Sequence, residues 1–293
     1  MNKPTIALFG TGLMGAPLAE RLLDAGYKLV VWNRSIEKTA PLAKKGALVA
    51  QSPAQAVQAA DVLITWLADR RAIQEVLFPP ERASLLEGKT LLQMATIGPS
   101  HSRALMDAAN AHGAEYLEAP VLGSIPEAQK GALLLMVGAT AAQYQRFLPL
   151  LQVFGANPVH VGEVGQAAAM KLAFNQLIAS LTSAFSLSLG LIQEEGVRVE
   201  LFMDMLRESA LYAPTFDKKL LRMLNRDYAN PNFPTRHLLK DTELFLDAAS
   251  EHGLIAASLE GVRDTIAVTL AKGLADADYS AINEVIHPAI TQR

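Results

Sequence analysis

The sequence predicts an α/β fold in which a doubly wound sheet is followed by an all-helical domain, with a long helix joining the two. Three observations lead to this prediction. Up to about residue 160, short runs rich in valine, isoleucine and leucine alternate with alanine-rich stretches of helical period, as in a parallel sheet covered by helices. After about residue 162 the patterns become long and helical. A charge-free stretch, Leu172 to Gln193, begins shortly after that change.

The candidate strands are six short apolar runs. They are Thr5–Phe9, Lys28–Trp32, Val62–Trp66, Thr90–Met94, Glu115–Glu118 and Leu133–Val137. The helix candidates between them are Ala16–Asp24, Pro53–Ala60, Arg70–Leu77, Ser100–His112 and Ala141–Leu150. Gly26 stands where a left-handed helix cap belongs, and Ser52 with Pro53 supplies an N-cap followed by proline at the first helical position.

The residue patterns in the second half of the chain indicate helices and a domain boundary. Helical patterns run over Val199–Ser209, Phe216–Leu224 and Leu238–His252. We therefore predict a sheet domain over residues 1–162 and an all-helical substrate and oligomerisation domain over 163–293. A long helix from about Gly165 connects them, and we expect a cleft where it meets the sheet domain, because clefts at domain junctions are common ligand sites.

Composition excludes several classes of protein. The 293 residues carry 26 lysines and arginines against 29 acidic residues, a net charge of −3, and no basic run exceeds a pair. This lacks the positive patch of a nucleic-acid or anionic-membrane binder, so we expect a small molecule or another copy of the chain as partner. The absence of cysteine excludes disulfides, thiolate catalysis and cysteine-ligated metals. The six histidines lack zinc-ligand spacing, so no metal is predicted.

The N-terminal segment and the charge-free stretch indicate where in the cell the protein is expected. The N-terminal segment lacks the long apolar core and cleavage site of a secretory signal and is interpreted as a first strand, so a cytoplasmic location is expected. The stretch from Leu172 could nearly span a bilayer, but it contains Asn175, Gln176 and several hydroxyl residues. That polarity favours a helix buried in a soluble protein or at a subunit interface, and a homodimer or homotetramer is expected.

A glycine-rich turn follows the first predicted strand. Its residues are Gly10, Thr11, Gly12, Leu13, Met14 and Gly15, which match G-x-G-x-x-G and open the next helix. With the strand that follows, they complete the βαβ unit of a Rossmann-type dinucleotide site. In such a site Gly10 allows a tight turn, Gly12 lets backbone N–H groups approach a pyrophosphate, and Gly15 lets the helix pack on the strand.

The residues that follow the second predicted strand indicate which cofactor the site prefers. A NAD-selective site usually has an acidic residue there to bind the ribose 2′-hydroxyl. This chain has Asn33 and Arg34 instead. Asn33 does not repel a 2′-phosphate, and Arg34 offers a planar donor group suited to phosphate oxygens. We therefore predict NADP(H) in preference to NAD(H), which makes residues 1–162 an NADP-binding domain.

Two further segments carry groups suited to substrate chemistry. The segment from Glu118 to Ser124 follows a predicted strand and offers N–H and O–H donors to a carboxylate. In the predicted long helix, Lys171 and Asn175 are spaced i, i+4 and so share one face. A lysine entering an apolar helix is costly unless it meets a partner or a cleft, so Lys171 is a functional candidate.

Together these motifs resemble the β-hydroxyacid dehydrogenases. The glycine turn followed by Asn-Arg, the E-A-P-V-x-G-S segment, the G-x-x-x-x-x-K-x-x-x-N helix and Lys240-Asp241 occur in that order over nearly the whole chain. Within the family, the runs Ala213–Phe216 and Asn232–Asp241 look most like those of the glyoxylate and succinic semialdehyde reductases. Two positions depart from the family pattern, which commonly has serine at Leu122 and glycine at Ala167. Leucine at position 122 lacks the hydroxyl that could donate to the substrate carboxylate, so the identity of the acid is left open.

The resemblance implies a role for each matched residue. Lys171 is implied as catalytic acid/base, and Asn175 as the residue that orients the substrate. The expected substrate-binding residues are Leu122, Gly123, Ser124, Asn175, Phe233 and His237. The expected cofactor-binding residues, besides the glycine turn with Asn33 and Arg34, are Leu67, Ala68, Thr96 and Lys240.

The function expected from this resemblance is NADPH-dependent interconversion of a small aldehyde or keto acid, such as glyoxylate or succinic semialdehyde, with its hydroxy acid. Three alternatives stay open. One is a NAD-dependent 3-hydroxyisobutyrate-type dehydrogenase, against which Asn33 and Arg34 argue. The others are an imine reductase and a non-catalytic nucleotide-binding module, and the presence of Lys171 counts against both.

Overall fold

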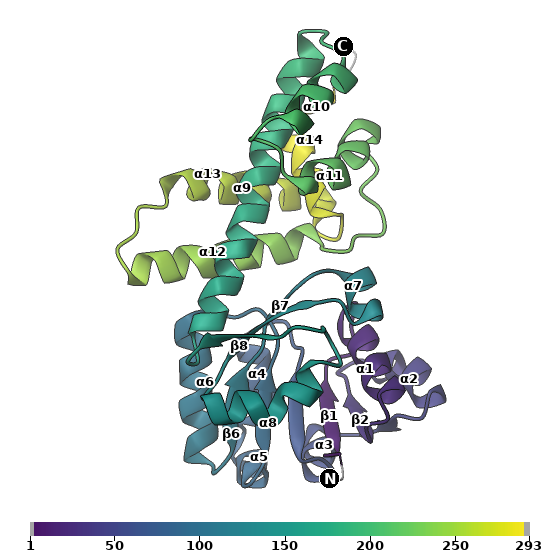
Figure 1. The fold of residues 1–293 in the computed structure, drawn as a ribbon, viewed down its shortest axis with the longest axis vertical. Helices are drawn as coiled ribbons and strands as arrows, with labels where there is room; N and C mark the ends of the chain where they lie inside the picture. Colours follow the sequence, from purple (N-terminus) through teal and green to yellow (C-terminus); the bar gives the residue numbers. More distant parts are fainter. Residues whose placement is uncertain (1–2, 290–293) are drawn as a thin grey trace. The chain divides into compact units, whose positions relative to one another are not determined.

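The chain folds into two units, one ending at Lys171 and the other beginning at Leu172, so that the division falls inside a single long helix (Figure 1). The structure is a computed structural model that describes residues 3–289. The predicted domain boundary at residue 162 precedes that helix, and this division of the chain stays a prediction. Each unit is described in turn.

The first unit is built on a sheet in the order β3-β2-β1-β4-β5-β6-β8-β7, with β9 paired to β8. Its strands are β1 (Ile6–Phe9), β2 (Leu29–Trp32), β3 (Leu48–Val49), β4 (Val62–Thr65), β5 (Thr90–Gln93), β6 (Glu115–Glu118), β7 (Val121–Leu122), β8 (Leu134–Gly138) and β9 (Val159–Gly162). β1 pairs in parallel with both β2 and β4, so the strand order reverses at β1. In open α/β sheets, ligands bind beyond the carboxyl ends of the strands at such a switch point.

Helices cover both faces of this sheet. Along β1, Ile6 and Leu8 pack with α1 (Gly15–Asp24), α7 (Ile125–Lys130) and α8 (Ala141–Leu151). Ala7 and Phe9 face the opposite side and pack with α3 (Pro53–Gln58), α4 (Arg70–Leu77) and α6 (Pro99–Ala111). Successive strand residues point to opposite faces, so each strand contributes to two apolar cores. The predicted doubly wound α/β fold is confirmed.

The sheet also corrects the sequence prediction. The predicted strand Leu133–Val137 forms as β8, but it runs antiparallel to β6 and β7, so the sheet is not parallel throughout. After β6 the chain forms the short β7 and α7, and β8 then returns as the antiparallel neighbour of both β6 and β7. The sequence prediction missed β3, β7 and β9, together with α2 (Ala40–Lys44), α5 (Pro80–Ala83) and α7.

Two predicted helix boundaries are confirmed by their capping geometry. The Ser52 side chain accepts a hydrogen bond from the backbone N–H of Gln55 at 3.2 Å, with Pro53 at the first helical position of α3. Gly26 follows α1 with a φ of +72°, the left-handed conformation expected of a residue that ends a helix.

The second unit is helical, as predicted, and its described residues form no strand beyond the isolated bridge of Pro234 with Asp278. Its helices are α9 (Gln166–Glu194), α10 (Val199–Glu208), α11 (Pro214–Asn225), α12 (Thr235–Glu251), α13 (Ala257–Thr269) and α14 (Asn283–Ile286). α12 and α13 lie side by side (Figure 1). The sequence prediction did not include α13, although it placed α10, α11 and α12 within a few residues of their observed bounds.

The helix α9 is the part of the described chain that is long and apolar enough to cross a membrane by length and composition, a test that the core helix of a soluble protein also passes. Two of its hydroxyl groups form hydrogen bonds within the second unit. The hydroxyl of Thr182 donates to the carbonyl of Ile178 at 2.7 Å, and the hydroxyl of Ser186 donates to Asn283 Oδ1 at 2.8 Å. These bonds fit a packed helix of a folded domain.

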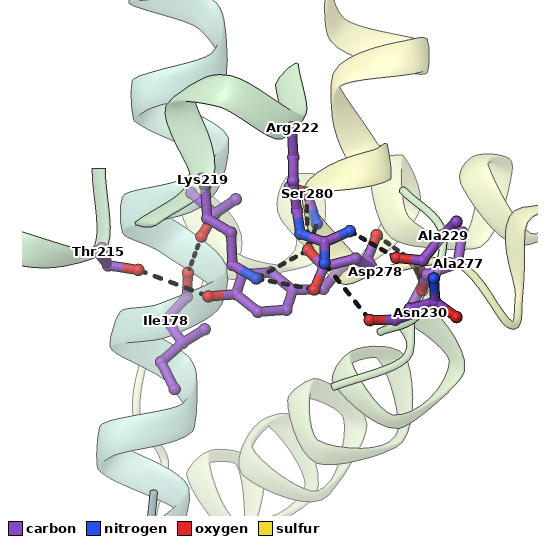
Figure 2. A network of polar contacts seen from close by, with 12 residues as sticks. Ile178, Thr215, Lys219, Arg222, Ala229, Asn230, Ala277, Asp278 and Ser280 are labelled. Carbon is purple, nitrogen blue, oxygen red and sulfur yellow. Dashed lines mark hydrogen bonds and ion pairs between the residues drawn. The ribbon is translucent and has the colours of Figure 1, made fainter. Parts of the chain in front are cut away.

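A buried ion pair holds α11 against the segment before α14 (Figure 2). The ammonium nitrogen of Lys219 lies 2.8 Å from both carboxylate oxygens of Asp278, which is fully buried. The same ammonium lies 4.0 Å from the ring centroid of Tyr279, and both the backbone N–H and the hydroxyl of Ser280 donate to Asp278. Because Asp278 is bonded from several sides, its charge is well compensated in the core.

Candidate active site

Apart from Lys240, which lies on α12, the predicted cofactor residues follow the carboxyl ends of four neighbouring strands. The glycine turn follows β1, Asn33 and Arg34 follow β2, Leu67 and Ala68 follow β4, and Thr96 follows β5. These strands are parallel neighbours in the sheet, so their carboxyl ends lie along one edge. The order of the strands therefore gathers residues from four separate parts of the first unit.

The glycine turn has the backbone geometry that a dinucleotide requires. Gly10 has a φ of +103°, and a Cβ there would lie 2.2 Å from the backbone oxygen of Trp66. A Cβ on Gly15, the first residue of α1, would lie 2.0 Å from the carbonyl oxygen of Gly10, so only glycine allows this packing. A Cβ on Gly12 would meet nothing within 4 Å, and Gly12 is exposed. The turn is thus tight at both ends and open at Gly12, where a pyrophosphate could approach the helix N-terminus.

Asn33 has a second role that the sequence did not reveal. Its Oδ1 accepts a hydrogen bond from the backbone N–H of Thr11 at 3.0 Å, and its Nδ2 donates to the carbonyl of Ser35 at 2.9 Å. The side chain therefore ties the glycine turn to the end of β2. The next residue, Arg34, is exposed. Of the two, Arg34 is the residue with a charged group that can reach outward to a phosphate.

The turn before Thr96 is shaped by Gln93, a buried residue that the sequence prediction missed. Its Oε1 accepts from the backbone N–H of Ala95 at 2.6 Å, and its Nε2 donates to the carbonyl of Ala95 at 2.7 Å. The hydroxyl of Thr65 also donates to Gln93 Oε1, at 3.2 Å. Thr96 and Leu67 are half-buried and Ala68 is exposed. A polar side chain at the end of an apolar strand was the available signal for Gln93.

Ser124 begins α7 as a helix cap. Its backbone N–H and its hydroxyl both donate to Glu127 Oε2, at 2.8 and 2.6 Å. Just before it, Gly123 has a φ of +140°, and a Cβ there would lie 2.6 Å from a Leu133 methyl group. Leu122 is half-buried at the end of β7. The Ser124 hydroxyl, which was predicted to donate to a carboxylate of the substrate, therefore donates to Glu127 in this structure, and the substrate role of Ser124 stays a prediction.

Lys171 and Asn175 lie one turn apart on α9, as their spacing predicts. Lys171 is half-buried, and Asn175 is 3% exposed. The Nδ2 of Asn175 donates to Asp241 Oδ2 at 2.5 Å. Because only the NH₂ end of an amide can donate to a carboxylate, this bond fixes the orientation of the Asn175 side chain.

Asp241 is the main residue of the site that the sequence prediction left out. It is 3% exposed on α12, and its Oδ1 lies 3.0 Å from the ammonium nitrogen of Lys240. Asp241 therefore links Lys240, predicted to bind the cofactor, with Asn175, predicted to orient the substrate. The only available signal was its place directly after Lys240 in the matched motif.

Phe233 and His237 lie together at the start of α12. Their rings stack with centroids 6.4 Å apart and an angle of 12° between the planes. Burial lowers the pKa of His237, and the charges of Lys240 and Arg236 lower it further, while Asp241 opposes them. The neutral imidazole is therefore favoured near pH 7. In the described residues 3–289, no group of three or more histidine, aspartate or glutamate side chains could hold a metal ion.

Two family models match the chain. The NAD-binding domain of 6-phosphogluconate dehydrogenase matches residues 5–162. The NAD-binding domain of NADP-dependent 3-hydroxyisobutyrate dehydrogenase matches residues 165–286. Together they span both units of the fold.

Individual proteins resemble the chain over nearly its whole length. Glyoxylate/succinic semialdehyde reductase 1 from Arabidopsis thaliana is 30% identical over 96% of this chain and 98% of its own length. The NAD-dependent L-serine dehydrogenase of Pseudomonas aeruginosa is 30% identical over 97% of this chain and 98% of its own length. A solved structure of 3-hydroxyisobutyrate dehydrogenase from Mycobacterium tuberculosis with L-serine superposes with a TM-score of 0.87, at 25% identity, over 97% and 99% of the two chains.

These matches agree with the glycine turn, the strand order and the all-helical second unit. The chain belongs to the β-hydroxyacid dehydrogenase family of NAD(P)-dependent oxidoreductases that act on CH–OH groups.

Proposed function

We propose that this hydroxyacid dehydrogenase is an NADPH-dependent reductase of small aldehyde or keto acids, with Lys171 as its general acid/base. Glyoxylate and succinic semialdehyde are the proposed substrates, and the corresponding hydroxy acids are the products. The observation that carries the proposal is the arrangement on α9, where Lys171 stands one turn before an asparagine held by a buried aspartate.

The groups on α9 suit the reduction of a carbonyl. The bound cofactor supplies hydride to the carbonyl carbon, and one proton completes the alcohol. The Lys171 ammonium donates a hydrogen bond to the carbonyl oxygen, and its positive charge stabilises the negative charge that develops on that oxygen. Lys171 then gives its proton to the oxygen, and takes it back in the reverse direction. The fixed amide of Asn175 restricts how the substrate lies beside the lysine.

The proposed function is tested by following the oxidation of NADPH and of NADH with a panel of carbonyl compounds. The panel comprises glyoxylate, succinic semialdehyde, methylmalonate semialdehyde and a cyclic imine. We expect the fastest turnover with NADPH and one of the aldehyde acids. Turnover of the imine alone would contradict the proposed substrate class, and turnover with NADH alone would contradict the proposed cofactor preference.

Arg34→Ala tests the preference for NADPH. We expect the variant to bind NADPH about 1.5–3 kcal/mol more weakly, because a charged hydrogen bond to the 2′-phosphate is lost. Its affinity for NADH should change little, since NADH lacks that phosphate. Dissociation constants for both cofactors, measured by titration of the nicotinamide fluorescence, check this.

Lys38→Ala is the matched control for Arg34→Ala. Lys38 is another exposed cation in the segment after β2, so its removal changes the net charge equally. It should leave the ratio of NADPH to NADH affinity unchanged. If Arg34→Ala also leaves that ratio unchanged, Arg34 does not bind the 2′-phosphate.

Leu122→Ser tests the effect of the leucine on the choice of acid. A serine hydroxyl adds a hydrogen-bond donor beside the Gly123 backbone, worth about 1 kcal/mol for a bound carboxylate. We expect kcat/KM for glyoxylate to rise about fivefold. Leu122→Ala opens the same space without a hydroxyl and should not give this gain. An equal effect of both variants would show that space, and not the donor, limits small substrates.

The remaining expectations concern assembly and location. We propose a homodimer or homotetramer in the cytoplasm, with no membrane or nucleic-acid partner. Exposed leucines on α9 support self-association, because Leu177, Leu187 and Leu191 are each at least half-exposed on similar sides of the helix. Light scattering of the purified protein measures the mass, and a monomer at micromolar concentration would contradict this proposal.

A further inference from the structure

A buried carboxylate that the proposed mechanism does not use lies at the start of the helix that carries Lys171. Glu118, the last residue of β6, is 1% exposed. Its Oε1 accepts hydrogen bonds from the backbone N–H groups of Gly165 and Ala168, at 2.8 and 3.1 Å. These two groups belong to the N-terminus of α9, where backbone N–H groups have no partner within the helix. Glu118 therefore caps α9 from a different element.

The cap comes from Glu118 because the helix does not supply its own. The first helical hydrogen bond of α9 runs from Ala169 to the carbonyl of Gly165, which places glycine at the N-cap position. Gly165 has a φ of +98°, and a Cβ there would lie 2.2 Å from the guanidinium of Arg103. The left-handed φ of Gly165 therefore disfavours a residue with a capping side chain at this position. The partner must come from elsewhere in the fold.

The rest of the Glu118 side chain is fixed from the other side. The hydroxyl of Ser102, on α6, donates to Glu118 Oε2, and the same hydroxyl lies 2.7 Å from the hydroxyl of Tyr116. Ser102 is fully buried. A Cβ on Gly138, which pairs with Glu118 across the sheet, would lie 2.5 Å from Oε1. The carboxylate therefore fills a closely fitted site and has little freedom to move.

Glu118 connects two segments that carry proposed substrate groups. It is the first residue of the segment that leads to Gly123 and Ser124. It also bonds the turn that precedes Lys171, since Ala168 and Lys171 are spaced i, i+3 on one helix face. We propose that Glu118 is a positioning residue that fixes the first turn of α9, and with it Lys171, relative to the 118–124 segment. This inference rests on the proposed role of Lys171.

Two replacements of Glu118 separate capping from other roles. In Glu118→Gln, the amide oxygen accepts from Gly165 and Ala168, while the NH₂ group donates to Ser102, whose own hydroxyl turns to Tyr116. We expect this variant to keep kcat within about threefold of the wild type, because every partner stays bonded. Glu118→Leu has similar size but no acceptor, and leaves the two N–H groups unpaired. We expect its kcat to fall about 30- to 100-fold, with the affinity for NADPH unchanged, because a misplaced proton donor affects only the chemical step.

Ser102→Ala is the matched control. It removes the hydroxyl that bonds both Glu118 and Tyr116, but it leaves both hydrogen bonds from α9 to Glu118. We expect it to lower the melting temperature while kcat stays within about threefold of the wild type. If Ser102→Ala and Glu118→Leu lower kcat equally, the effect is general destabilisation and the proposal is wrong. Equal losses in Glu118→Gln and Glu118→Leu would also overturn it, because capping requires only the oxygen that glutamine retains.

Hydrogen exchange gives a readout that does not depend on activity. Peptides covering residues 163–172 should exchange about tenfold faster in Glu118→Leu than in the wild type, and at the wild-type rate in Glu118→Gln. Unchanged exchange in Glu118→Leu would overturn the positioning role even if the enzyme is active. If the wild type reduces none of the acids, the proposed function fails, whereas the exchange rates still decide whether Glu118 holds the turn. Should Glu118→Leu not fold, Gly138→Ala displaces the carboxylate instead and should give the same two effects.

Discussion

Lys171→Ala is expected to lower kcat by about 10³-fold while the dissociation constant for NADPH changes less than about twofold. The lysine is assigned to stabilising the developing alkoxide and to transferring its proton, and both interactions are made only in the chemical step. The proposed cofactor-binding residues other than Lys240 instead follow the carboxyl ends of β1, β2, β4 and β5. Steady-state kinetics with the best aldehyde acid, together with a fluorescence titration of NADPH, measure the two quantities separately.

Lys171→Arg is the control for charge. Arginine keeps the positive charge and the N–H donors, but its pKa is too high for it to release a proton during turnover. We expect kcat to fall nearly as far as in Lys171→Ala, since charge alone does not replace proton transfer. Turnover of Lys171→Ala within tenfold of the wild type would remove Lys171 from the mechanism.

Asp241→Ala is expected to lower both stability and kcat. The change leaves the buried Asn175 amide without its 2.5 Å partner and removes the carboxylate beside the Lys240 ammonium. Loss of a buried hydrogen bond to a charged group costs about 1.5–3 kcal/mol in the free energy of unfolding. Because Asn175 then loses the bond to this carboxylate, we also expect kcat to fall about 10²-fold. Urea unfolding measures the first effect, and steady-state kinetics measure the second.

Asp241→Asn separates orientation from charge. Its amide oxygen can still accept from Asn175, whereas the ion pair with Lys240 is lost. We expect kcat to recover at least tenfold relative to Asp241→Ala, with NADPH binding weakened if Lys240 contacts the cofactor. If Asp241→Ala has wild-type kcat, the orientation of Asn175 does not matter for the reaction.

The sheet domain was largely predictable because its signals are local. Short runs dominated by apolar residues predicted β1, β2, β4 and β5, and the glycine turn located the first βαβ unit. The strands that were missed lack that signal. β3 and β7 contain only two residues each, and β9 is largely exposed, so neither length nor hydrophobicity marks them. The direction of β8 depends on its pairing with β6, which no local pattern records.

The site was predictable only where its residues are adjacent or share a helix face. The spacing of Lys171 and Asn175 gave their common face directly. The bond from Asn175 to Asp241 spans 66 residues, and that from Gly165 to Glu118 spans 47. Such bonds arise when the chain packs, so the sequence showed the donors and acceptors but not their pairing. Similarly, the capping bonds of Ser124 depend on how α7 begins. The motif alone predicted only a substrate-binding role for Ser124.

We propose that this chain transfers hydride from NADPH to the carbonyl carbon of a small acid. The most direct test uses NADPH carrying deuterium at both C4 positions, with glyoxylate or succinic semialdehyde as acceptor, and mass spectrometry of the product. We predict a hydroxy acid that carries one carbon-bound deuterium, formed by the wild type and not at a comparable rate by Lys171→Ala. If NADPH binds but no deuterium appears in either hydroxy acid, the protein is not a reductase of these acids.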